Sequence, residues 1–147
     1  MAKHLETSID VRAPAQAVWE VMVDWNAQGD WMLGTRVSST GEGLGATLKA
    51  FTGLSRIGFL DVMTITRWEP PTRCDVVHVG RLVRGTGSFQ VTPTSQTSAR
   101  MTWIEDLEVP GGAVGRVALK MGEPVFMKGL EVSLRRFARL VESAQPA

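Results

Sequence analysis

The sequence has little cysteine, no surplus of charge and no long apolar run. Cys74 is the single cysteine among 147 residues, so no internal disulfide can form and a reducing compartment is indicated. No apolar leader opens the chain and no run of about eighteen apolar residues occurs, which predicts a cytoplasmic protein that does not insert into a membrane. Sixteen Lys and Arg against fifteen Asp and Glu give a net charge of +1, which argues against nucleic acid as a partner.

Tyrosine is absent as well, yet the chain holds five Trp, five Phe and seven Met. Large apolar side chains can fill a core, and they can also line an adaptable pocket, because Met is flexible. Composition leaves both interpretations open. The length corresponds to one domain, residues 1–147, which can bury a core without a disulfide or a metal.

The clearest periodic pattern is a predicted amphipathic helix over residues 124–142. Its charged residues fall on the side opposite the apolar stripe. Pro124 suits the first turn, where its missing N–H would have no partner. A separate short helix or turn is expected over residues 113–121, ended by Gly122. The apolar stripe consists of Phe126, Met127, Leu130, Leu134, Phe137 and Val141.

The first two thirds of the chain favour strands. Residues 4–13 alternate between apolar and polar side chains, as a half-buried strand does, and a short helix follows over residues 14–25. Consecutive strands joined by short turns predict an antiparallel sheet with one face covered by the C-terminal helix. Gly85 to Gly87 suggest a bend or bulge. The further strands are expected over residues 36–39, 46–54, 58–68, 73–83, 88–92 and 97–108.

This order of elements and three local strings carry a family resemblance. The strings are APAQAVWEVMVDW, TRWEPPTRCDVVHVGRLVRGTGSF and MTWIEDLEV. The chain resembles the START-like helix-grip superfamily (SRPBCC), specifically its small bacterial polyketide cyclase/dehydrase-like group, which is similar to the plant Bet v 1 type. The resemblance implies an α+β fold in which a curved seven-stranded antiparallel sheet wraps around the long C-terminal helix. It also implies two short helices after the first strand, and a cavity between sheet and helix.

The resemblance implies binding or transport of a small hydrophobic or aromatic molecule, lipid or polyketide-like, by a monomer or homodimer. It brings no single catalytic motif with it. The alternative is an enzyme of the cyclase, aromatase or dehydratase kind. A third class, an interaction module, would be favoured by an exposed apolar patch. We expect the cavity to hold a few hundred Å³. The residues expected to line it are Trp19, Trp25, Trp31, Phe89, Met101, Trp103, Phe126 and Leu130.

Glu105 is the first candidate for chemistry. It shares a strand face with Met101, Trp103 and Leu107, where a carboxylate must be paired, hydrogen-bonded or protonated. It could hold a ligand hydroxyl or transfer a proton. Alternatively, it lies at the rim of the sheet and pairs with an arginine.

His78 is the second candidate, on the strand face opposite Asp75 and Arg81. A neutral imidazole facing a pocket could act as acid, base or hydrogen-bond donor, and with Glu105 it could form a dyad. Alternatively, it is a core or surface histidine with a backbone partner. No third residue that would orient His78 as a catalytic base is evident, which favours a carrier over an enzyme.

The remaining polar residues predict no metal and no cofactor. Cys74 and His78 lie about 13 Å apart on an extended strand, too far to share one ion. No strand leads into a helix through a dinucleotide-binding fingerprint. Arg56, Arg81 or Arg84 could face inward and bind a carboxylate or enolate, or each could be a solvated charge.

Overall fold

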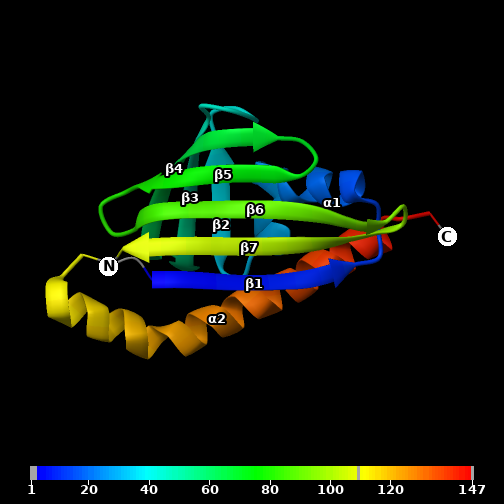
Figure 1. Cartoon of the computed structure of the whole chain (residues 1–147). Coiled ribbons are helices and arrows are strands. Elements are labelled where there is room, and N and C mark those ends of the chain that lie inside the picture. The colour runs from blue at the N-terminus through cyan, green and yellow to red at the C-terminus, as the bar shows by residue number, and fades with distance from the viewer. Residues whose placement is uncertain (1–2, 109, 147) are drawn as a thin grey trace.

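The computed structural model describes residues 3–108 and 110–146. One antiparallel sheet of seven strands curls around the long C-terminal helix, as the family resemblance implies (Figure 1). The spatial order of the strands is β1-β7-β6-β5-β4-β3-β2. Every pair of adjacent strands is consecutive in sequence except β1 and β7. The strands are β1 (Lys3–Val11), β2 (Thr35–Ser39), β3 (Thr47–Leu54), β4 (Ile57–Glu69), β5 (Arg73–Val79), β6 (Arg84–Ser95) and β7 (Ser98–Glu108).

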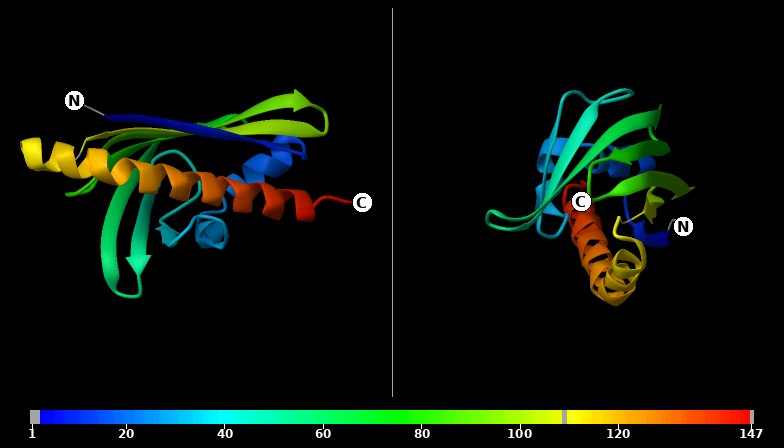
Figure 2. Two further views of the ribbon diagram at one scale, coloured as in Figure 1. Left: turned by 90° about the horizontal axis from the view of Figure 1, so that it is seen from below. Right: turned by 90° about the vertical axis from the view of Figure 1, so that its left-hand side faces the viewer.

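Two short helices join β1 to β2: α1 (Ala15–Met22) and the 3-10 helix η1 (Trp25–Asp30). Figure 2 shows that the β3–β4 hairpin stands at a steep angle to the long strands β1, β7 and β6. The helix α2 (Gly112–Ser143) crosses beneath the concave face, alongside β1. Neither α1 nor α2, among the described residues, has the length and apolar character that a bilayer-spanning helix needs.

The two halves of α2 have different surroundings. The C-terminal half buries the predicted stripe from Leu130 onward against the sheet, because the stripe residues recur at intervals of three and four. Phe137 has no exposed surface and meets the Trp31 ring edge-on, with 4.9 Å between ring centroids. The N-terminal half stands away from the sheet. Its apolar residues Val114, Val117, Met121 and Val125 are between 58% and 80% exposed.

The expected break between two C-terminal helices is wrong, since α2 runs unbroken through Gly122 and Pro124. Pro124 supplies no N–H to the carbonyl of Lys120, four residues earlier. Both residues are exposed, so water can reach that carbonyl, and the helix tolerates the proline. Likewise, the expected bend at Gly85 to Gly87 lies inside the continuous strand β6, and β5 ends at Val79 instead of residue 83.

We expect Phe137→Ala to lower the free energy of unfolding by about 3–5 kcal/mol, because it opens a cavity in a packed core. Arg135→Ala, two residues away on the exposed face, should cost less than about 0.5 kcal/mol. Denaturant melts of the two variants check this. Equal losses would mean that the buried face of α2 is assigned to the wrong side.

Candidate functional site

A cavity of about 580 Å³ lies between the concave face of the sheet and the N-terminal half of α2. It exists because that half of the helix stands off while the other half fills the core. Most of its wall is apolar, with Leu48, Met63 and Val76 from the sheet and Met32 from the segment after η1. The helix contributes Gly122, Gly129 and Ser133, and the small size of these residues leaves room beneath α2.

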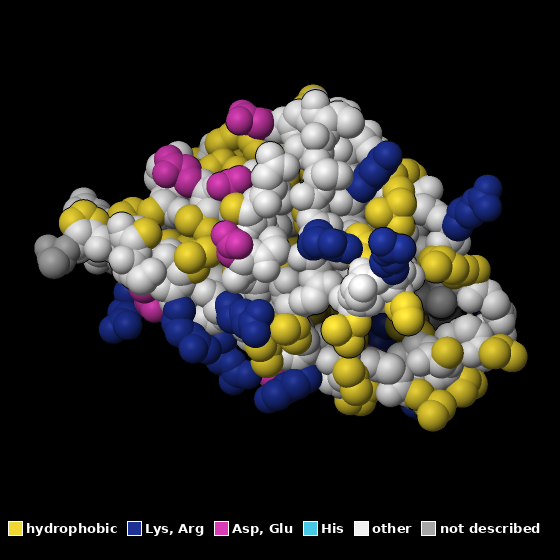
Figure 3. Space-filling model, turned by 180° about the vertical axis from the view of Figure 1, so that it is seen from behind, with side chains coloured by type: hydrophobic (Ala, Val, Ile, Leu, Met, Phe, Trp, Pro, Cys, Tyr) yellow, Lys and Arg dark blue, Asp and Glu magenta, His cyan; other side chains and the backbone are white. Residues whose placement is uncertain are grey.

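Exposed apolar side chains surround the open end of this cavity. Seen from behind, hydrophobic side chains gather around a hollow at one end of the molecule (Figure 3). Phe59 and Val125 belong both to this exposed group and to the cavity wall, so the group borders the opening. Leu54 and Ile57, at the tip of the β3–β4 hairpin, are 85% and 84% exposed.

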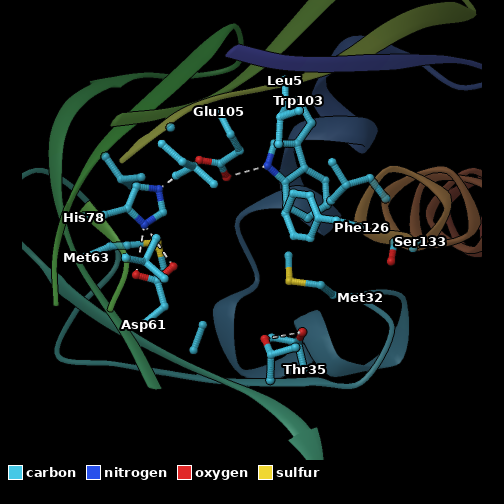
Figure 4. A pocket seen from close by; sticks show the side chains of 18 of the residues that line it. Leu5, Met32, Thr35, Asp61, Met63, His78, Trp103, Glu105, Phe126 and Ser133 are labelled. Atoms are coloured by element: carbon cyan, nitrogen blue, oxygen red, sulfur yellow. Dashed lines mark hydrogen bonds and ion pairs between the residues drawn. The ribbon is translucent and has the colours of Figure 1, made fainter. Parts of the chain in front are cut away.

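Three ionisable side chains meet on the sheet wall of this apolar cavity (Figure 4). His78 on β5 lies between Asp61 on β4 and Glu105 on β7. Its Nδ1 is 2.9 Å from both carboxylate oxygens of Asp61, and its Nε2 is 2.8 Å from Oε2 of Glu105. The Trp103 indole N–H donates to Oε1 of Glu105 at 2.7 Å. We call Asp61, His78 and Glu105 the carboxylate–histidine cluster.

Gly87 on β6 allows Glu105 to reach His78. Glu105 is paired in register with Gly87, and its side chain must cross β6 to arrive at β5. A Cβ atom at Gly87 would lie 2.8 Å from Oε2 of Glu105 and 3.1 Å from Val76 on β5. A larger residue here would therefore displace the Glu105 carboxylate, which is the flexible end of its side chain, from its place beside His78.

The cluster is charged despite its burial. Burial by itself lowers the pKa of His78, since an imidazolium loses solvation, but the hydrogen bonds to Asp61 and Glu105 outweigh that loss. The net effect raises the pKa of His78 to about 9, so the ring is an imidazolium at neutral pH. Both ring nitrogens already point at carboxylates, so His78 has no free lone pair with which to accept a proton from a ligand.

Five of the eight residues expected to line the cavity do so: Trp25, Phe89, Trp103, Phe126 and Leu130. The structure places Trp19, Trp31 and Met101 in the packed core instead. Trp31 is fully buried behind Phe89 and Trp103, with ring centroids 6.2 and 6.1 Å away.

Trp19 and Met101 also lie in the core because of their local contacts. Trp19 on α1 packs edge-on against Trp68, with centroids 5.0 Å apart. Met101 is paired with Ile9 near the end of β7 that α1 covers, so no cavity remains there.

The structure brings Glu105 and His78 together on the inner face, and it adds two residues that the sequence analysis missed, Asp61 and Gly87. The expectation that no residue orients His78 is wrong, because Asp61 and Glu105 both hydrogen-bond to its ring. Asp61 shares a strand face with Met63, which lines the cavity, but the exposure of both Phe59 and Leu60 removes the contrast between the two faces of β4 from which this could have been inferred. Gly87 carries no signal either, because its role depends on a side chain from the next strand.

The other candidates lie outside the chemistry of the cluster. Arg56, Arg81 and Arg84 are exposed, and none lines the cavity. Cys74 does line it, but burial raises the pKa of its thiol to about 12, so it is protonated and a weak nucleophile. Within residues 3–108 and 110–146, no three His, Cys, Asp or Glu side chains are grouped so that they could hold a metal ion. In the cluster itself, both nitrogens of His78 are occupied by contacts with Asp61 and Glu105.

Comparison with known proteins gives a consistent result. The family described as polyketide cyclase / dehydrase and lipid transport matches residues 2–142. No curated protein sequence matches the chain. The aromatase/cyclase Zhui from Streptomyces sp. R1128 has a similar fold, with a TM-score of 0.82 at 17% identity, and the match covers 97% of this chain and 94% of that one.

Two further solved structures share the fold. One is a START superfamily protein from Mycobacterium smegmatis, with a TM-score of 0.76 at 13% identity over 97% of this chain and 99% of that one. The other is norcoclaurine synthase from Thalictrum flavum in complex with dopamine and hydroxybenzaldehyde, with a TM-score of 0.72 at 16% identity over 100% and 90%. At such identities these likenesses concern the fold.

We expect Gly87→Ala to lower the pKa of His78, because the added methyl displaces Glu105 from Nε2. An NMR titration of the His78 ring measures this directly. Gly122→Ala is the matched control, since a Cβ there meets nothing within 4 Å and should leave the pKa of His78 unchanged. An unchanged pKa in Gly87→Ala would show that Glu105 does not depend on the glycine.

The cluster should also make stability pH-dependent. A folded-state pKa of His78 near 9, above the usual 6.5, stabilises the fold fully below about pH 6.5, and that stabilisation is lost as the pH rises through about 9. We expect a loss on the order of 1–3 kcal/mol in the free energy of unfolding across this window.

Denaturant melts at several pH values should therefore show a smaller decline for His78→Gln than for the wild type. His4→Gln is the control, because His4 is the other histidine and is exposed to solvent that screens its partners. If His78→Gln declines as steeply as the wild type, the imidazolium contributes nothing to stability.

Proposed function

Because the chain belongs to the polyketide cyclase/dehydrase and lipid-transport family, we propose that it binds and carries a small hydrophobic or aromatic molecule in the cavity between the sheet and α2. The observation that carries this proposal is an apolar cavity of about 580 Å³ with one polar cluster on its wall. Sites for small molecules usually have this size and this composition, since apolar surface gives affinity and a few polar groups fix orientation.

The exposed apolar side chains at the opening support the same function. Contact with apolar surface favours the transfer of an apolar ligand out of water, and Phe59, Val125 and Phe126 are exposed apolar residues that also line the cavity. Two aromatic residues of the cavity wall, Trp103 and Phe89, form an edge-to-face pair with centroids 5.1 Å apart and favour a flat aromatic ligand.

Catalysis of the cyclase or dehydratase kind is the second candidate, favoured by the chain of contacts from Asp61 through His78 to Glu105. General acid–base catalysis by such groups raises a reaction rate by roughly 10²–10⁴-fold. The carrier is preferred, because a general base needs a free lone pair and both nitrogens of His78 are engaged. In an enzyme, Asp61 or Glu105 would have to take the proton in its place.

A screen of hydrophobic and aromatic compounds by thermal shift and native mass spectrometry, followed by product analysis of each hit, tests the proposal. We expect hits to raise the melting temperature and to be recovered chemically unchanged. Turnover that falls at least about a hundredfold in both His78→Ala and Glu105→Gln, with binding kept, would replace the carrier by the enzyme. His4→Ala, which alters an exposed histidine, should have no effect on either readout.

A further inference from the structure

With one proton in each nitrogen–carboxylate contact, the carboxylate–histidine cluster carries one net negative charge. Each of the two nitrogen–carboxylate contacts needs one proton between its atoms. An imidazole ring without N–H protons and two carboxylates would together carry three negative charges, and the two shared protons leave one. This charge is the same whether each shared proton sits on His78 or on the carboxyl group.

No positive side chain on the cavity wall balances this charge. The described residues that line the cavity include no Lys and no Arg. Glu123 is the other carboxylate on the wall, and Lys3 already pairs with it at 2.9 Å. The cluster therefore lies in apolar surroundings with its charge uncompensated, and such a charge is costly to leave without a partner.

The cluster can accept hydrogen bonds but has none left to donate. Both His78 nitrogens and the Trp103 indole N–H are already used on carboxylates. Each carboxylate oxygen can accept more than one hydrogen bond, so Asp61 and Glu105 keep acceptor capacity. Their side chains are 14% and 11% exposed, against 3% for His78, so a molecule in the cavity meets carboxylate oxygens before it meets the ring.

We propose that the cavity selects hydrophobic molecules that carry a protonated amine, with the ammonium group donating to a carboxylate oxygen of Asp61 or Glu105 and the apolar body lying among the aromatic residues of the wall. This inference names the ligand class of the proposed binding function and rests on it. An ammonium supplies both the donor and the positive charge that the cluster needs. A neutral hydroxyl supplies only the donor. A carboxylate supplies neither, and it would be repelled.

Three probes with one apolar body test the selection: 2-naphthylmethylamine, 2-naphthylmethanol and 2-naphthoic acid. Isothermal titration calorimetry at pH 7 and constant salt gives their affinities for the wild-type protein. We expect the amine to bind at least about tenfold more tightly than the alcohol, because a charge-assisted hydrogen bond is roughly twice as strong as a neutral one. The acid should bind most weakly of the three.

Two isosteric variants locate the effect. Asp61→Asn and Glu105→Gln each remove one carboxylate charge and keep the shape of the side chain. In each, the advantage of the amine over the alcohol should fall by about tenfold, while the affinity for the alcohol stays within about threefold. Glu131→Gln is the matched control, because it removes an exposed carboxylate on the outer face of α2 and should leave the order of the probes unchanged.

The outcomes separate this inference from the function on which it rests. If the wild type binds the probes but prefers the alcohol or the acid, the amine selection is wrong and the carrier function stands. If the amine is preferred equally in Glu131→Gln, Asp61→Asn and Glu105→Gln, the preference does not come from the cluster, and the inference fails. If no probe binds the wild type, both the inference and the proposed function fail.

Discussion

The rest of the structure depends on the way α2 packs against the curled sheet. Only the half from Leu130 to Val141 is packed against the sheet, and within it the buried Phe137 meets the Trp31 ring edge-on. This contact fixes the helix at one end, and the curl of the sheet then leaves the other half without a partner layer. The C-terminal half of α2 therefore stabilises the fold, and its N-terminal half covers the cavity. Substitutions in the N-terminal half can consequently alter the cavity at little cost to the core.

A buried charge in this cavity is the second organising feature. Unpaired carboxylates in apolar surroundings are strongly unfavourable, and an imidazolium between two of them offsets much of that cost. The arrangement needs four neighbouring strands to cooperate: β4 and β5 bring Asp61 and His78, β7 brings Glu105, and β6 leaves space at Gly87. A group so well supported is rigid, and rigid polar groups orient ligands. His78 is nevertheless a poor proton acceptor, because both of its ring nitrogens already make hydrogen bonds to carboxylates.

The family resemblance implied the fold, and the alternation of residues along the strands predicted two members of the cluster. Glu105 and His78 lie in strands whose alternation separates a buried from a solvated face, so their direction could be inferred. Asp61 escaped because β4 begins in a protruding hairpin, where Phe59 and Leu60 on both faces are exposed and alternation loses its meaning. Gly87 escaped because glycine is also typical of bends. Trp31 and Met101 could not be distinguished from wall residues, because the boundary between core and cavity is set by how closely α2 approaches, which is a property of the whole fold.

The central claim is that the carboxylate–histidine cluster is the polar anchor of a ligand held in the cavity. A crystal structure of the protein with 2-naphthylmethylamine tests it most directly. The account predicts the naphthalene ring between the sheet and α2, with its amine nitrogen within about 3 Å of a carboxylate oxygen of Asp61 or Glu105. A ligand bound outside the cavity, or one bound inside with its amine directed away from both carboxylates, would contradict it.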